Sequence, residues 1–226
     1  PLTTAGRRLL IFPFLTSDIG GAICYHPPML RLTLILPALL LPLLMGNTAF
    51  SADFQKGLDA YGRGDFATAL KEFRPLAKQG HAIALHNMGV MYAKGQGVPR
   101  NYKTAATWYA RAAEKGDVSA QFSLGWMYDK GVGVPQNGKI AVKWYTLAAE
   151  QGYAIAQENL GAMYAFGRGV PKDYVKAYKW GELAAAKGYG RAARLRDMVA
   201  AMMTPSQVET AQDLARECVK KNYKGC

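Results

Sequence analysis

The side chains best suited to chemistry are scarce in this chain. Its 226 residues include three histidines and three cysteines. His81 and His86 are five residues apart, about 140° around a helix, so they would not share the face that a metal ion needs. The motifs S-x-x-K and G-x-S-x-G for a serine nucleophile, H-E-x-x-H for zinc and C-x-x-C for redox chemistry do not occur. We therefore predict no catalytic residue, metal site or cofactor.

Three short glycine motifs resemble fragments of phosphate-binding loops. The G-x-G steps at residues 95–97, 131–133 and 167–169 each follow a helical pattern rather than a strand, and none extends to G-x-G-x-x-G. We interpret them as loops that end helices. An enzyme would have to assemble its chemistry from scattered single residues.

The elements that would position a site repeat along the chain. Segments that begin at Ala84, Ala120 and Ala156 align without a gap, which gives a period of 36 residues. An earlier copy over residues 54–80 aligns once a five-residue gap is allowed. Such a period is typical of stacked supersecondary units, none of which buries its apolar face alone. We therefore predict an all-α solenoid of four units.

Each copy has the pattern of a helical hairpin. Its first helix has one apolar stripe, formed in the first full copy by Ala84, Met88, Met91 and Tyr92. This helix ends at a glycine, and a G-V-P segment forbids its continuation. The second helix begins after an Asn or Asp and stops at a glycine. The predicted N-caps are Asp65, Asn101, Asn137 and Asp173, and the predicted stops are Gly80, Gly116, Gly152 and Gly188.

The second helices of the full copies each carry one tryptophan between two alanines. These residues are Trp108, Trp144 and Trp180. A tryptophan can serve as a platform for a ligand, but three at an identical position are more typical of a repeated core. Alternating large and small side chains let adjacent hairpins interdigitate. We therefore predict that the three rings are structural and buried.

The whole pattern resembles a known family. The sequence A-x3-[LM]-G-x2-Y-x2-G-x-G-V-P, followed by Asn or Asp, A-x2-W and A-A-x2-G, is similar to the Sel1-like repeat, a relative of the tetratricopeptide repeat. Three such repeats fill residues 81–191, and residues 53–80 resemble a tetratricopeptide repeat more closely. The resemblance implies a right-handed α/α superhelix that binds proteins or peptides, commonly in the bacterial envelope. Family members described as β-lactamase-like have a disulfide in each repeat, whereas these repeats contain no cysteine.

Residues 192–226 depart from the repeat and are predicted to form capping helices. The sequence T-P-S-Q at residues 204–207 is a capping box with proline at the first helical position, which predicts a final helix over about residues 205–221. Cys218 and Cys226 would then lie near its end. In an oxidising compartment they predict one disulfide that closes a short loop, and in a reducing compartment two free thiols.

The first 52 residues are predicted to lie outside the repeats. Residues 29–52 have the pattern of a signal peptide: a methionine, one arginine, an apolar run over residues 32–44 and then small and polar residues. A membrane anchor is the alternative, but the run is short for a bilayer and contains two prolines. We interpret residues 1–28, before the first methionine, as an untranslated upstream segment. The mature protein is thus expected in the periplasm, without a stable membrane anchor.

Partner binding is expected on the face of the first helices that the packing stripe leaves open. Positions such as 86, 90 and 93 lie 140–200° from the buried position 88, and tetratricopeptide-like repeats line a concave groove with them. Phe122 and Trp126 are the predicted anchors, because interface energy concentrates in aromatic side chains. The alternative is that both rings pack against a neighbouring helix. The predicted groove residues are Gln55, Asp59, His86, Val90, Phe122, Trp126, Asp129, Glu158 and Ala162.

Composition restricts the partner. Lys and Arg outnumber Asp and Glu by 28 to 16, which favours an acidic protein or peptide, and no nucleic acid is expected. We interpret the chain as a non-enzymatic scaffold, an adaptor for envelope assembly or stress. An immunity-type inhibitor of a toxic enzyme is an alternative within the binding class. A cell-wall or β-lactam hydrolase is the alternative from a different class, which a nitrocefin or peptidoglycan-digestion assay would detect.

Overall fold

The computed structural model describes residues 53–226; the predicted upstream segment (1–28) and signal peptide (29–52) lie outside the described residues. Residues 53–62 form a helix, further helices follow, and this part of the chain contains no strand. The labelled helices are α2 (Phe66–Lys78), α3 (Ala82–Lys94), α4 (Tyr102–Glu114), α5 (Val118–Lys130), α6 (Gly138–Ala149), α7 (Ala154–Phe166), α8 (Tyr174–Ala185), α9 (Gly190–Ala200) and α10 (Pro205–Lys220).

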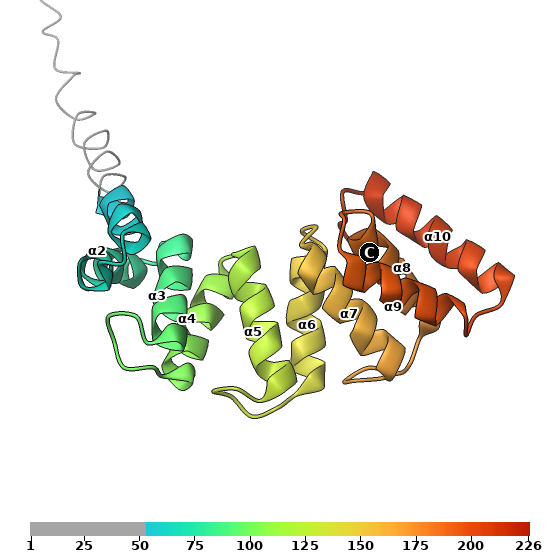
Figure 1. Cartoon of the computed structure of the whole chain (residues 1–226), viewed down its shortest axis with the longest axis horizontal. Coiled ribbons are helices and arrows are strands. Elements are labelled where there is room, and N and C mark those ends of the chain that lie inside the picture. Colours follow the sequence, from blue (N-terminus) through green and yellow to red (C-terminus); the bar gives the residue numbers. More distant parts are fainter. Residues whose placement is uncertain (1–52) are drawn as a thin grey trace, which may run out of the picture. The chain divides into compact units, whose positions relative to one another are not determined.

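Helices that are neighbours in the sequence pack against each other (Figure 1). The three repeats form the hairpins α3–α4, α5–α6 and α7–α8, which have the most extensive contacts. Helix α3 also contacts α5, the first helix of the next hairpin. The fold is the predicted all-α superhelical repeat.

The predicted N-caps and the glycine ends of the first helices are confirmed. The second helices instead end two or three residues before the predicted glycines, at Lys78, Glu114, Ala149 and Ala185. Asn101 begins α4, and its side-chain oxygen accepts a hydrogen bond from the backbone N–H of Thr104 at 2.9 Å. Gly95 ends α3 in the left-handed conformation, with a φ of 72°, and its N–H donates to the carbonyl of Met91. The same N-cap bond is made by the other predicted caps, Asp65, Asn137 and Asp173.

The apolar stripe of the first helices forms the core. In α3 the side chains of Ala84, Met88 and Met91 are buried, and Tyr92 is partly buried against them. The equivalent positions are buried in the next two copies: Ala120, Leu124 and Met127, then Ala156, Leu160 and Met163. Each hairpin therefore buries its stripe against its neighbours, as stacked repeats require.

The predicted burial of the tryptophans is wrong for two of the three. Trp180 is 2% exposed, but Trp108 and Trp144 are only partly buried at the edge of the core. The next residue along the helix fills the centre instead, since Tyr145 is 0% exposed. Trp108 lies on the outer side, where the guanidinium of Arg111 covers its ring at 4.9 Å. A cation over the ring lets an indole remain half in water.

Glycines inside the first helices make room for these tyrosines. A Cβ added to Gly125 would lie 2.8 Å from Cδ1 of Tyr145, and one added to Gly89 would lie 2.6 Å from Cδ1 of Tyr109. Atoms cannot approach that closely without displacing the ring. The close contact explains why glycine is present although it lowers helix stability by about 0.5–1 kcal/mol relative to alanine.

The G-x-G loops also set the contact between adjacent repeats. Gly169 has a φ of 74°, and a side chain there would overlap the backbone of Gly138, the first residue of α6 in the preceding repeat. Gly133 lies against Tyr102 at the start of α4 in the same way. These loops therefore end a helix and also allow the backbones of adjacent repeats to pack closely.

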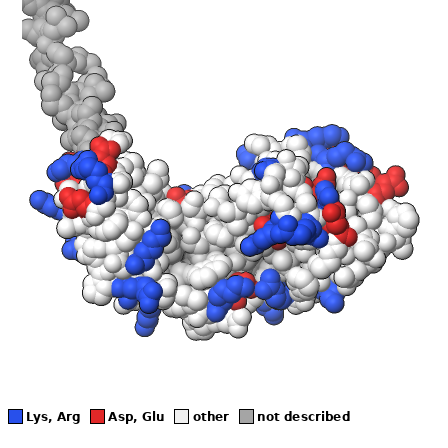
Figure 2. All heavy atoms as spheres, viewed as in Figure 1, with Lys and Arg blue, Asp and Glu red and all other residues white. Residues whose placement is uncertain are grey.

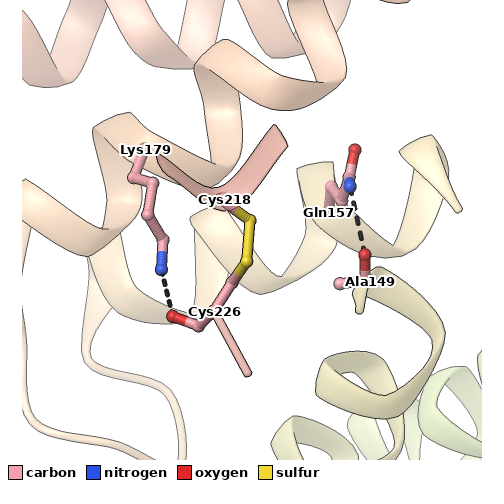
Figure 3. Close-up of a disulfide and its surroundings, with 5 residues drawn as sticks. All are labelled: Ala149, Gln157, Lys179, Cys218 and Cys226. Atoms are coloured by element: carbon pink, nitrogen blue, oxygen red, sulfur yellow. Dashed lines mark hydrogen bonds between the residues drawn. A yellow bond between two sulfur atoms is a disulfide. The ribbon is translucent and has the colours of Figure 1, made fainter. Parts of the chain in front are cut away.

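Side chains of each repeat complete the hydrogen bonds of the repeat before it. Gln157 is buried, and its Nε2 donates to the carbonyl of Ala149 at 3.1 Å (Figure 3). Lys187 Nζ donates to the carbonyl of Gly152 at 2.5 Å. Earlier in the chain the corresponding bonds are Gln121 to Ala113, Gln151 to Gly116 and Arg111 to Ala77. Carbonyls at the ends of the second helices thus gain a partner from the next repeat, which for Ala77, Ala113 and Ala149 adds to the glycine N–H of their own repeat.

The C-terminal cap is closed by a disulfide. Helix α10 begins with the predicted capping box at Thr204 and packs on α8. Cys218 near its end is bonded to Cys226 (Figure 3). The buried Lys179 of α8 donates from Nζ to the carbonyl oxygen of Cys226 at 2.5 Å. Burial, together with the nearby charge of Lys176, lowers the pKa of Lys179 to about 8.

Candidate protein-binding groove

Most of the predicted groove residues form one array on the first helices. Six of them occupy two positions, one turn apart, on α3, α5 and α7: His86 and Val90, Phe122 and Trp126, and Glu158 and Ala162. Gln55 and Asp59 lie on the helix of residues 53–62, where both are exposed and Gln55 donates to Asp59 at 2.8 Å. The structure brings Phe122 and Trp126 into one pocket, and the Gln55–Asp59 pair is not part of it.

This pocket lies between α3, α4 and α5 and has a volume of about 250 Å³. Trp126 is 40% exposed at its wall. Phe122 is partly buried, so it both lines the pocket and packs internally, with its ring centroid 5.4 Å from that of Tyr153. The lining residues are Ala93, Tyr102, Tyr109, Phe122, Ser123, Trp126 and Met127. A recess of this size, lined mainly by apolar and aromatic groups, suits one large side chain of a partner.

Of the residues that line the pocket, only Phe122 and Trp126 are among the predicted groove residues. Tyr109 was hidden by the more conspicuous Trp108 beside it. A signal was present in two of the three copies, where a glycine in the first helix accompanies a tyrosine in the second: Gly89 with Tyr109, and Gly125 with Tyr145. The third full copy departs from this pattern, because Gly181 occupies the tyrosine position. Tyr102, which is 38% exposed, has no such signal, since glycine occupies its position in the next repeat.

The floor of the pocket carries no charge at neutral pH. Burial raises the pKa of Tyr109 to about 12, so its phenol stays protonated. The ring of His86 lies 5.7 Å from that of Tyr109. Burial lowers the pKa of His86 below 6.5, although the charge of Asp117 opposes this shift. A neutral floor favours an apolar group over an ion.

Two predicted groove carboxylates are engaged in ion pairs. Asp129 is 7% exposed and lies 2.8 Å from Lys130 Nζ and 3.5 Å from a guanidinium nitrogen of Arg168. Glu158 is 8% exposed and pairs with Arg191 at 2.6 Å. Their charges are compensated within the protein, so neither is a free acceptor for a partner.

Two further features were sought among the described residues. Within residues 53–226, no three or more His, Cys, Asp or Glu side chains are grouped to hold a metal ion. Over the same residues, no helix has both the length and the apolar character required to cross a membrane. Each hairpin repeats its packing positions on one side and has a variable, partly aromatic face on the other. This arrangement defines a helical-repeat protein.

Comparison with known proteins identifies the class further. The Sel1 repeat family matches three consecutive segments, residues 82–117, 118–153 and 154–189. The chain belongs to the Sel1 repeat family. Proteins with this repeat are generally protein-interaction scaffolds, and the fold is typically non-enzymatic.

The solved structures that are similar to this chain include two repeat proteins. One is the crystal structure of a Sel1 repeat protein from Oxalobacter formigenes, with 31% identity and a TM-score of 0.57 over 75% of this chain and 77% of that one. The other is c5321, a protective antigen of uropathogenic Escherichia coli strains with an SLR fold, with 26% identity and a TM-score of 0.54 over 77% of this chain and 47% of that one. A search of curated proteins gives no match.

Proposed function

We propose that this protein is a non-enzymatic scaffold that binds a protein or peptide in the groove formed by α3, α5 and α7. The observation that carries this proposal is the pocket beside Trp126. A large ring that is 40% exposed, in a recess with a neutral apolar floor, is the kind of feature at which binding energy concentrates. The membership of the Sel1 repeat family supports the same function.

The same proposal places the protein in the periplasm. The bond between Cys218 and Cys226 supports an oxidising compartment, because disulfides are rare in the cytosol. The signal-peptide pattern of residues 29–52 agrees with export. N-terminal sequencing of protein from its host is expected to begin between Phe50 and Asp53. A mature protein that starts upstream of Met29 would contradict export.

The groove is tested with two variants whose effects should be opposite. Trp126→Ala should weaken partner binding by about 2 kcal/mol, roughly 30-fold, and change thermal stability little, because the ring is exposed. Tyr145→Ala should leave a cavity in the core and lower the free energy of unfolding by about 3–5 kcal/mol. Leu214→Ala on α10 is the control for binding, since Leu214 is also exposed, at 44%, but lies outside the groove.

The partner for this measurement is obtained by capture from an envelope extract, mass spectrometry and separate production. Affinities are then measured by titration calorimetry, and stabilities by thermal unfolding. If Trp126→Ala lowers the thermal stability as much as Tyr145→Ala does, Trp126 belongs to the core. If Trp126→Ala binds as tightly as Leu214→Ala, the partner uses another face.

A further inference from the structure

One edge of the repeats carries an uneven distribution of charge. The loops that join the first and second helix of each hairpin lie along this edge (Figure 1). Adjacent loops lie close together, since a Cβ added to Gly169 would overlap the backbone of Gly138. We call residues 94–103, 130–139 and 166–175 the loop edge. Its charged residues are seven exposed cations, Lys94, Arg100, Lys103, Lys130, Lys139, Arg168 and Lys172, and a single carboxylate, Asp173.

The opposite edge, where each hairpin joins the next, has no such excess. Over residues 78–81, 114–117, 150–153 and 186–189 there are three Lys or Arg and three Asp or Glu side chains. The positive balance of the described chain is therefore concentrated on the loop edge. In Figure 2 Lys and Arg side chains gather along the edge where Figure 1 shows these loops.

Most of the loop-edge cations are not compensated within the protein. Lys130 and Arg168 share the carboxylate of Asp129. Asp173 is occupied as the N-cap of α8, where its side chain accepts a hydrogen bond from the backbone N–H of Lys176. Within residues 53–226, no ion pair links the other five cations, Lys94, Arg100, Lys103, Lys139 and Lys172, to a carboxylate of the protein.

The loop edge is continuous with the apolar pocket. Tyr102 belongs to both, because it lines the pocket and lies 5.6 Å below the guanidinium of Arg100. Ala93 lines the pocket and is followed by Lys94, and Lys130 comes one helical turn after Trp126. A ligand with its apolar group in the pocket would therefore have its neighbouring groups beside these cations.

We infer that the pocket and the loop edge form one recognition site for an acidic peptide segment of a protein partner. The segment places a large apolar side chain in the pocket, and its neighbouring Asp and Glu side chains lie against Lys94, Arg100 and Lys103. This inference rests on the proposed groove function and adds the chemistry of the partner. A protein segment is favoured over a nucleic acid because the disulfide indicates a compartment outside the cytosol.

The test begins with a library of random dodecapeptides displayed on phage and selected on the purified protein. Enriched peptides should combine an aromatic or long aliphatic residue with neighbouring Asp or Glu. The best of them is then synthesised with a fluorescent label, and its Kd is measured by anisotropy. Replacing its Asp and Glu with Asn and Gln should weaken binding at least about tenfold, as for several rim charges acting together.

Matched protein variants locate the charges. The loop-edge variant combines Lys94→Glu, Arg100→Glu and Lys103→Glu, and the control combines the same charge reversals on the exposed face of α2, Lys71→Glu, Arg74→Glu and Lys78→Glu. The loop-edge variant should raise the Kd at least about tenfold, and the control should change it less than about twofold. Circular dichroism and thermal unfolding confirm that both variants are folded. The neutralised peptide should bind wild type and the loop-edge variant alike, because the coupled charges are gone.

Each contrary result has a separate meaning. Enriched peptides without acidic residues, or equal binding to both variants, would overturn the inference and leave the groove function intact. Binding that needs the loop-edge cations but not Trp126, and that phosphatidylglycerol vesicles abolish by competition, would overturn it in favour of a general anion surface. A peptide Kd that is unchanged in both Trp126→Ala and the loop-edge variant would overturn the groove function as well.

Discussion

Replacing Gly125 with alanine should destabilise the protein, although the same change stabilises most helices. Gly125 lies inside α5, where alanine would favour the helix by about 0.5–1 kcal/mol. The added Cβ would lie 2.8 Å from Cδ1 and 3.0 Å from Cε1 of Tyr145. That ring is among the largest fully buried side chains of the described chain. Overpacking of this kind opposes folding by about 1–3 kcal/mol, so we expect a net loss of about 1–2 kcal/mol.

The assay is thermal and urea unfolding, with two comparison variants. A loss of 1–2 kcal/mol should lower the Tm by about 2–8 °C in a chain of this size. Gly190→Ala is the matched control, because the nearest atom to its added Cβ is Arg194 Nη1 at 3.9 Å, and it should be neutral or stabilising. Combining Gly125→Ala with Tyr145→Leu should recover part of the loss relative to the sum of the two single changes, since a smaller side chain removes the overlap. Stabilisation by Gly125→Ala similar to that by Gly190→Ala would refute the idea that the glycine exists for close packing.

Three further outcomes are expected. Cys226→Ser should lower the free energy of unfolding by about 2–3 kcal/mol, because the disulfide restricts the unfolded chain, and hydrogen exchange should show the loss in α10; unchanged exchange there would contradict a role for the bond in holding the cap. Burial lowers the folded-state pKa of His86 below 6.5, so the unfolded state binds a proton first as the pH falls. The stability of the protein should therefore decrease below about pH 6.5, and His86→Gln should reduce this loss. Equal Tm changes between pH 7 and 5 in the wild type and the variant would exclude a role for His86. Gly169→Ala should cost about 3 kcal/mol or more, above Gly125→Ala, because it meets backbone atoms at a φ of 74°; a smaller loss in urea unfolding would show that adjacent loops can separate.

The sequence predicts the helices well because each boundary depends on local chemistry. Asn101 accepts a hydrogen bond from the backbone N–H of the residue three positions later, and Gly95 adopts a left-handed conformation. Both features depend only on the residue and its immediate neighbours. The repeat period adds independent evidence, since three copies must share one structure. These features suffice for the fold.

The sequence predicts burial less well, because burial depends on how a helix is rotated against its neighbours. Trp108 and Tyr109 are adjacent in α4 and differ by about 100° around it. The larger ring is the natural choice for the core, yet the space left by Gly89 fits the tyrosine. Size alone does not predict which ring is buried, because the partner surface decides it.

The groove shows the same limit for charged residues. Asp129 and Glu158 occupy positions on the open face, and a helical wheel predicts that both are available to a partner. Each instead pairs with an arginine from a later element, Arg168 or Arg191, which local periodicity does not reveal. Pairing between residues more than 30 positions apart requires the three-dimensional stack. Trp126 differs, since its ring stays 40% exposed.

Within residues 53–226, the side-chain hydrogen bonds to carbonyls at the ends of the second helices all run from a later repeat to an earlier one. Gln157 and Lys187 belong to the third full repeat and satisfy carbonyls of the second, Ala149 and Gly152. The end of each second helix therefore gains further hydrogen bonds when the next hairpin packs against it. Because the chain emerges from a ribosome or a secretion pore from its N-terminus, each hairpin emerges before the side chains that donate these bonds. These bonds therefore connect each hairpin to the one made after it, and the disulfide-closed cap is the last part of the chain to be made.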